Sequence, residues 1–563
     1  MKIRRIPLWA WAFLAFFAAA LVLRAAGIMW GLPDTFNGDE PHLVNLALSF
    51  GGGSLRPYAF KYPTLWPYLL FFSYGIYFLI WSGFGLRHGV EAFAGLYAWH
   101  PTGFYLIGRV LSAAAGLLGA LAVLKMERES SRRPWGAILL LFSPVIVELS
   151  HSCKPDCLMF FFAALAWLFA LRIYRGGGRR EHWLCGAFFG LAFSSQYTVL
   201  PAALALPLAH FFSRRRRPLR SLAEGLACVP AAFLAGSPYA LLDYKNFRKW
   251  TSMYAPRALA LRGTWSRLGI FKAVLGNIWH FAGPGLVPGA ALLAGLAIVL
   301  RKDWKLAGLL TLPVLAYIPF LINNPDGAWQ RYLLGIFPAL AFLASDAFEA
   351  LAAASRPWLA AAVFAAALFP GAARCVAMDK TMRLPDTRQL AQAWIERNIP
   401  QGSALLLDEA NDSPRLIMAK DEAEELAERT KAEGSPRWRL YRAMADYQPG
   451  GGYWIYRIKR SAESLGTYPL QVALSQADAP IVDARGGLAA VRKAGVDYVV
   501  TSSMGATPER SPGLAAYFRQ LQKQGILVAR FDPAPGQIAG PVLRVYRIRL
   551  GASRGRGARP RAF

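Results

Sequence analysis

Long apolar segments constrain the fold of this chain more than any other feature. The first of them, residues 8–29, is long enough to cross the hydrocarbon core of a bilayer, which takes roughly 20 residues. The 563-residue chain is 55% hydrophobic and only 17% charged, yet its formal net charge is +29. This combination indicates a polytopic membrane protein with Lys and Arg in cytoplasmic loops, and it argues against a nucleic-acid partner.

Clusters of basic residues predict which ends of the apolar segments are cytoplasmic. By the positive-inside rule these ends carry the clusters at 125–133, 172–180, 214–220 and 301–305, and Arg356. Residues 8–29 lack a convincing small-residue cleavage site, so we expect an uncleaved helix with a cytoplasmic N-terminus. The sequence therefore predicts a bacterial inner-membrane protein with about 11 transmembrane helices plus interfacial helices.

Two stretches fit this count less simply than the others. Segment 104–124 must run inward, so the aromatic-rich stretch 65–85 should lie along the outer leaflet rather than cross it. An ordinary span there, with an error elsewhere in the count, is the alternative. Residues 183–212 are short for the two crossings that the basic clusters require of them.

The composition becomes that of a soluble protein after the last apolar segment. Residues 1–376 are therefore expected to form the membrane domain and residues 377–551 an external, periplasmic domain. Helical patterns such as "TRQLAQAWIERNI" alternate with strand patterns such as "VDYVVTS", which predicts an α/β fold. Residues 419–452 are interpreted as a surface excursion, and the basic tail 552–563 as disordered.

Polar residues recur where the predicted helices meet the external side. Ionisable groups at membrane depth are costly and usually functional, whereas single loop residues prove little. The candidates are Asp39, Glu40, His42, Lys61, Arg109, Lys154, Asp156, Gln196, Asp243 and Arg331.

The stretch "FNGDEPH" contains the only adjacent pair of carboxylates in this external set. The pair could act as a general base that takes a proton from an acceptor hydroxyl, or it could form a metal site. Asp39 could equally cap the helix that Pro41 opens. The two interpretations of Asp39 are compatible.

The cationic candidates also have structural alternatives. Lys61 at an interfacial helix start could bind a phosphate, or it could extend to the lipid headgroups. Arg331 suits bidentate phosphate binding but could be an interfacial anchor. Lys154 and Asp156 at a helix start could form an ion pair or a cap.

Several short motifs together carry a family resemblance. They are the "DE" followed by Pro and His, the "K-Y-P-x-L" of "FKYPTLWPY", "GRVLSAAAG", "SHSCKPD", "GLAFSSQYT", "GSPYALLD" and "QRYLLGIFPALA". In this order the sequence is similar to the polyprenyl-phosphate-sugar-dependent glycosyltransferases of the GT-C fold. That family includes protein O-mannosyltransferases and the lipid A aminoarabinose transferase. The motifs cover most of residues 1–351, and the C-terminal part resembles external domains that some members carry.

The resemblance implies a role for each matching position. Asp39 matches the essential first-loop aspartate that engages the acceptor, and Glu40 matches its neighbour, which supports the site or a divalent metal (Mg or Mn) where one is used. Lys61 matches a residue that binds the donor phosphate, and Arg331 and Arg109 are further phosphate candidates. The remaining matches are polar positions at the cavity edge: His42, Lys154, Asp156, Gln196, Tyr197 and Asp243. Gln196 departs from the family pattern, which often has Lys there.

The resemblance implies an inverting transfer of a sugar from a polyprenyl phosphate to an external protein, lipid or glycan. Asp39 would act as base while Lys61 and Arg331 stabilise the leaving phosphate. A lipid or sugar transporter, or flippase, is the alternative, although transporters favour repeated halves that this sequence lacks. A non-catalytic scaffold with the same fold is a third possibility.

Overall fold

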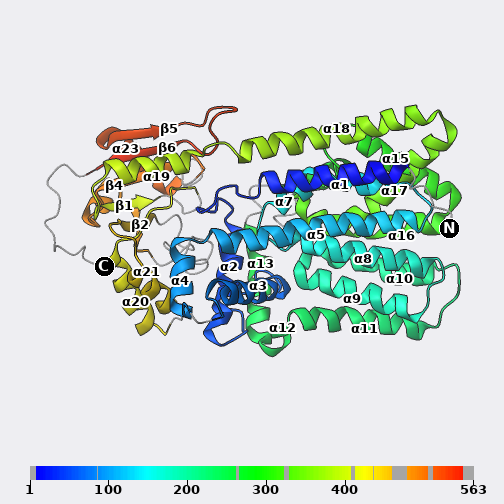
Figure 1. The fold of residues 1–563 in the computed structure, drawn as a ribbon, viewed down its shortest axis with the longest axis horizontal. Coiled ribbons are helices and arrows are strands. Elements are labelled where there is room, and N and C mark those ends of the chain that lie inside the picture. Colours follow the sequence, from blue (N-terminus) through cyan, green and yellow to red (C-terminus); the bar gives the residue numbers. More distant parts are fainter. Residues whose placement is uncertain are drawn as a thin grey trace. The chain divides into compact units, whose positions relative to one another are not determined.

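The computed structural model describes residues 8–84, 87–260, 266–322, 329–407, 412–434, 437–458, 479–504 and 512–548. The basic tail 552–563 lies outside these ranges. The chain forms two compact units (Figure 1). Unit 1 comprises Met1–Ile28, Gly53–Leu70 and Ile107–Asp379, and unit 2 comprises Met29–Gly52, Phe71–Leu106 and Lys380–Phe563.

Unit 1 is a bundle of helices, many of which run alongside one another in Figure 1. In chain order these are α1 (Leu8–Ala26), α5 (Thr102–Arg128), α6 (Trp135–Leu141), α7 (Pro144–Ser150), α8 (Asp156–Tyr174), α9 (Arg179–Ser195), η2 (Tyr197–Leu204), α10 (Ala205–Phe211), α11 (Leu219–Gly236), α12 (Tyr239–Leu242), α13 (Tyr244–Ala260), α14 (Arg267–Trp279), α15 (Val287–Lys302), α16 (Trp304–Ile322), η4 (Gln330–Leu333), α17 (Phe337–Ala354) and α18 (Pro357–Met382). Helix α3 (Leu65–Trp81) begins in unit 1 and continues into unit 2.

The protein is a multi-pass membrane protein with fewer long spans than the sequence predicts. Within the described ranges, seven helices are long and apolar enough to cross a bilayer: α1, α5, α8, α11, α16, α17 and α18. Two shorter apolar segments are Leu65–Trp81 and Tyr197–Phe211. The described residues thus contain seven long apolar helices, or nine with the two shorter segments, where about 11 spans were expected. Part of the difference arises because helices break, as between α6 and α7 before Pro144. The interfacial orientation of α3 stays a prediction.

Helices α9 and α11 approach each other unusually closely at three glycines. A Cβ atom on Gly186 would lie 1.9 Å from the carbonyl oxygen of Gly225, and one on Gly190 would lie 2.3 Å from that of Val229. Small residues four apart allow this contact, which is a common way for helices to associate in membranes. Several candidate residues follow the C-terminal ends of these two helices.

Unit 2 contains the first loop, two short helices and an α/β domain. The loop leads into α2 (Asp39–Ser49) and η1 (Phe50–Gly52), and α4 (Val90–Trp99) comes later in the chain. The strands of the domain are β1 (Ala404–Leu407), β2 (Trp454–Ile458), β3 (Ile481–Val482), β4 (Tyr498–Ser502), β5 (Ile526–Phe531) and β6 (Leu543–Arg547). Its helical segments are α19 (Thr387–Asn398), α20 (Lys420–Ala432), α21 (Trp438–Asp446), η7 (Ala484–Gly486), α22 (Leu488–Lys493), η8 (Pro512–Leu514) and α23 (Ala515–Gln524).

The six strands form one mixed sheet in the order β3-β2-β1-β4-β6-β5. Strands β3, β2, β1 and β4 are parallel, whereas β6 pairs antiparallel with both β4 and β5. Alternate side chains of β1 enter two hydrophobic cores, one on each face of the sheet. Leu405 and Leu407 belong to the first core, and Ala404 and Leu406 belong to the second. Helices α19, α20 and α21 line the first core and α22 and α23 the second, so the predicted α/β fold is confirmed.

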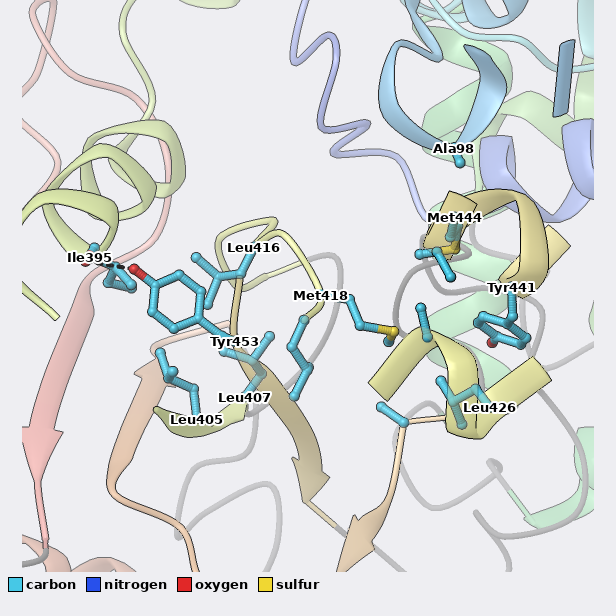
Figure 2. Close-up of a cluster of buried hydrophobic side chains, with 14 of the residues drawn as sticks. Ala98, Ile395, Leu405, Leu407, Leu416, Met418, Leu426, Tyr441, Met444 and Tyr453 are labelled. Carbon is cyan, nitrogen blue, oxygen red and sulfur yellow. Dashed lines mark hydrogen bonds between the residues drawn. The ribbon is translucent and has the colours of Figure 1, made fainter. Parts of the chain in front are cut away.

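Residues 419–452 are part of the first core, so their interpretation as a surface excursion is wrong. They form α20 and α21, and Leu426, Tyr441 and Met444 are buried (Figure 2). Most of the abundant charged residues of this segment lie on the outer faces of two amphipathic helices, whereas Glu422 is buried. Ala98 of α4 joins the same core, so α4 packs on α21.

Candidate functional site

The predicted site residues fall into both units. Asp39, Glu40 and His42 belong to unit 2, and the remaining candidates belong to unit 1: Lys61, Arg109, Lys154, Asp156, Gln196, Tyr197, Asp243 and Arg331. The predicted proximity of Asp39 to Lys61 and Arg331 joins the two units and stays a prediction.

Asp39 is the first residue of α2 and not its cap. The N-cap is Gly38, and the side-chain Oδ1 of Asn37 accepts a hydrogen bond from the Asp39 backbone N–H at 3.2 Å. The capping interpretation of Asp39 is therefore wrong. Its half-buried carboxyl group lies in the first turn, where the helix dipole favours a negative charge.

Helix α2 is polar on part of its buried surface. Glu40, His42 and Asn45 are all buried, although they occupy a short helix next to an exposed loop. Asn45 Oδ1 accepts a 2.6 Å hydrogen bond from the Tyr97 hydroxyl, which lies 3.4 Å from the Tyr105 hydroxyl. Buried polar groups that are hydrogen-bonded fix an orientation, so α2 is held in register against α4 and α5.

The segment around Lys61 is attached to residues at the C-terminal ends of α9 and α11. Thr64 donates its backbone N–H to Ser237 Oγ at 3.0 Å and its hydroxyl to the Gly236 carbonyl at 3.1 Å. The Tyr197 hydroxyl donates to the Phe60 carbonyl at 3.4 Å. Lys61 itself is half-buried, with Nζ 5.5 Å from the centroid of the Tyr62 ring. The fold therefore brings together Lys61 and Tyr197, which are distant in the sequence.

Gln196 and Asp243 have structural roles at helix ends. Gln196 is a buried residue in extended conformation at the C-cap of α9, immediately before Tyr197. Asp243 follows α12 and accepts a 2.7 Å hydrogen bond from Arg56 Nε. Arg56 and then Asn246 hold the pKa of Asp243 below its usual range. Asp243 is thus ionised and paired with an exposed arginine.

A second group of candidates surrounds the start of α8. Arg109 is fully buried and donates from Nη1 to the Ile28 carbonyl at 2.8 Å. Lys154 is buried too, and the Ser112 hydroxyl lies 3.4 Å from its carbonyl oxygen. Asp156 is the first residue of α8, and neither carboxylate oxygen has a hydrogen-bond partner among the described residues. Asp156 is therefore a buried carboxylate without a hydrogen-bond partner among the described residues, which is uncommon in a folded protein.

Glu148 is a residue that the sequence reasoning missed. It is exposed on α7, whose other residues are mostly buried, and Lys154, Arg374 and Arg331 are near enough to act electrostatically on its carboxylate. Arg331 lies on η4, and its guanidinium is 5.1 Å from the centroid of the Tyr332 ring. Unit 1 thus gathers Lys154 and Arg331 around one carboxylate. A lone Glu inside the apolar run 135–149 was the available signal.

The residues around Glu40 do not form a metal-binding set. Among the described residues, no group of three or more His, Cys, Asp or Glu side chains could hold a metal ion. A divalent ion prefers several oxygen ligands, which Glu40 and Asp39 alone do not supply. No step proposed below passes through a metal.

Two comparisons bear on this arrangement. Residues 105–241 match the family described as dolichyl-phosphate-mannose-protein mannosyltransferase. The chain is also similar to the crystal structure of ArnT from Cupriavidus metallidurans bound to undecaprenyl phosphate. The superposition has a TM-score of 0.52 at 14% sequence identity, and it covers 96% of this chain and 98% of the ArnT chain. The chain has the GT-C fold of ArnT.

Two further solved structures are similar to the chain to different degrees. ArnT from the same organism in the apo state gives a TM-score of 0.53 at 15% identity, covering 95% of this chain and 98% of ArnT. The apo oligosaccharyltransferase of Archaeoglobus fulgidus is more distant, with a TM-score of 0.45, 12% identity, and coverage of 86% and 69%. No curated protein sequence matches the chain. The GT-C resemblance predicted from the sequence motifs is confirmed, by sequence over residues 105–241 and by fold over most of the chain.

Proposed function

We propose that this protein is an integral membrane glycosyltransferase that moves a sugar from a polyprenyl-phosphate donor to an acceptor on the external face. The observation that carries the proposal is the match of residues 105–241 to a family of sugar-phosphate-dependent transferases within a GT-C fold. ArnT, which shares this fold, was crystallised with undecaprenyl phosphate. The acceptor is a protein, a lipid or a glycan.

The donor phosphate is proposed to bind to cations of unit 1. Lys61 is half-buried on a segment whose Thr64 is held by hydrogen bonds to Gly236 and Ser237, so the backbone that carries its point charge is fixed. Arg331 and Lys154 are near the same carboxylate, Glu148, which indicates a concentration of positive charge. Fixed cations stabilise the negative charge that develops on a departing phosphate.

Asp39 is proposed to act as the base. Its carboxylate would accept the acceptor's proton as the acceptor oxygen bonds to the anomeric carbon and the bond from that carbon to the phosphate oxygen breaks. The leaving group is already a stable anion, so no general acid is needed. A single displacement of this kind inverts the configuration of the anomeric carbon.

The proposed location in the cell rests on the positions of the basic clusters in the sequence. The N-terminus is proposed to be cytoplasmic and the C-terminal domain periplasmic, in a bacterial inner membrane, because the basic clusters then lie inside. In this orientation α1 runs outward, so Asp39 and Lys61, which come after it in the chain, would lie on the external side.

The test is a transfer assay with purified protein, labelled polyprenyl-phosphate sugars and candidate acceptors. Asp39→Asn should lower turnover by about 10²- to 10⁴-fold, the usual contribution of a general base, while donor binding is retained. Asp446→Asn, which changes an exposed carboxylate on α21, is the matched control and should be fully active. Full transfer by Asp39→Asn would refute the base assignment. Movement of the intact donor across vesicles without sugar transfer would instead identify a flippase, and neither activity would favour a scaffold.

A further inference from the structure

The first loop makes direct contacts with the α/β domain of unit 2. The loop consists of residues 29–38 and ends immediately before Asp39, and it is compact in itself. The rings of Trp30 and Phe36 are 6.0 Å apart, and a Cβ atom on Gly31, whose φ is +67°, would lie 2.6 Å from the Phe36 ring. Phe36 is therefore packed onto the start of its own loop.

Helix α19 contacts this loop through its first turn. The guanidinium of Arg388 lies 3.4 Å from the centroid of the Phe36 ring, a cation–π contact. Its Nε and Nη2 each donate to one carboxylate oxygen of Asp386 at 2.8 Å. Gln389 donates from Nε2 to Asp34 Oδ2 at 3.3 Å. Asp386 is itself held in place as the N-cap of α19. The guanidinium of Arg388, which stacks on Phe36, is therefore anchored to the start of this helix.

Arg415 makes a second attachment from the segment after β1. It donates from Nη1 to the Pro33 carbonyl and from Nη2 to the Ala98 carbonyl, both at 2.8 Å. One guanidinium thus joins the first loop to α4, which itself packs into the domain core through Ala98 (Figure 2). Burial raises the pKa of Asp34, and the nearby charge of Arg415 is the largest of the effects that lower it.

We propose that the α/β domain positions the loop that carries Asp39, with Arg415 as the principal positioning residue. The proposal rests on the proposed role of Asp39 as base. All three contacts lie within six residues of Asp39, and the nearest, at Phe36, is three residues away. Asn37, whose side chain accepts from the Asp39 N–H, links Phe36 to the start of α2. A base that is misplaced by about 1 Å can cost on the order of 10²-fold in rate, so such support has catalytic consequences.

Arg415→Met in the full-length protein tests this proposal. The side-chain hydrogen bonds of Arg415 go to Pro33 and Ala98, and the methionine keeps its apolar bulk. Amide exchange of residues 35–42, measured by mass spectrometry, should accelerate about tenfold or more, since two charge-assisted hydrogen bonds are lost. Turnover should fall by about 10- to 100-fold with the donor KM nearly unchanged. Arg415→Lys keeps the positive charge but not the two-pronged guanidinium group. Its exchange rate and turnover should therefore lie between those of Arg415→Met and those of the unaltered protein.

Arg530→Met is the matched control, because it removes an exposed Arg–Asp pair on β5 that does not contact the loop. It should leave exchange and turnover as in the unaltered protein. Unchanged exchange of residues 35–42 in Arg415→Met would overturn the proposal, and so would faster exchange with full turnover. If the unaltered protein transfers no sugar from any donor, the proposed function fails, and the exchange measurement alone then decides whether the domain holds the loop.

Discussion

The support of Lys61 by Ser237 leads to a quantitative prediction. Ser237 is buried at the C-terminal end of α11, where its Oγ accepts the Thr64 N–H at 3.0 Å and lies 2.8 Å from Ser194 Oγ. Ser237→Ala removes this oxygen without adding bulk. Thr64 is three residues after Lys61, so the substitution loosens the attachment of the lysine without touching it.

The expected cost follows from the groups that lose their partner. The Thr64 N–H and the Ser194 hydroxyl are both buried, and each unsatisfied buried group costs about 1–3 kcal/mol. Partial relaxation and access to water reduce the sum, so Ser237→Ala should lower the free energy of unfolding by about 2–4 kcal/mol. Ser194→Ala should remove one of the two orphaned groups, so the double variant should lose about 1 kcal/mol less than the sum of the single variants.

Unfolding in mixed detergent micelles, followed by tryptophan fluorescence, measures these differences. The control is Ser252→Ala, an exposed serine on α13 whose hydroxyl donates to the Lys249 carbonyl at 3.0 Å, and it should change stability by less than about 0.5 kcal/mol. If Lys61 binds the donor phosphate, the donor KM of Ser237→Ala should also rise while turnover is largely retained. The reasoning is refuted if Ser237→Ala is as stable as Ser252→Ala, or if Ser194→Ala and Ser237→Ala are strictly additive.

Two further predictions concern stability. Gly186→Ala should destabilise the protein by about 1–3 kcal/mol, because its Cβ would lie 1.9 Å from the carbonyl oxygen of Gly225 and must push α9 and α11 apart. Gly276→Ala is the control, since a Cβ there would meet no atom within 4 Å. It should be neutral or stabilising in the same unfolding assay. Burial raises the pKa of Glu422, whose Oε2 accepts the Ile455 N–H at 3.0 Å. Above the ordinary glutamate pKa of 4.5, the folded state therefore binds more protons than the unfolded state. The free energy of unfolding should fall as the pH rises above that value. Glu422→Gln should flatten that pH dependence and be the more stable protein at pH 8, and an unchanged slope would contradict the assignment.

The sequence predicted the features that depend on local pattern. Residues 8–29 correspond to α1, and the helix at "TRQLAQAWIERNI" and the strand at "VDYVVTS" were located correctly, because periodicity and apolar length are properties of a single segment. The same reasoning failed where charge hid an amphipathic face. Leu426 and Met444 lie in a core although their segment is rich in Lys, Arg and Glu, because only one side of each helix is buried.

Contacts between distant segments were decided by the tertiary structure alone. No local pattern joins Thr64 to Ser237 or Arg415 to Pro33. Each of these links depends on backbone atoms brought together by packing, and a backbone carbonyl or N–H leaves no signature in the residue type. The sequence by itself determined a helical membrane protein with acidic and basic residues at its helix ends. The fold decided which of them are held in place, because only close packing such as that of α9 on α11 sets those distances.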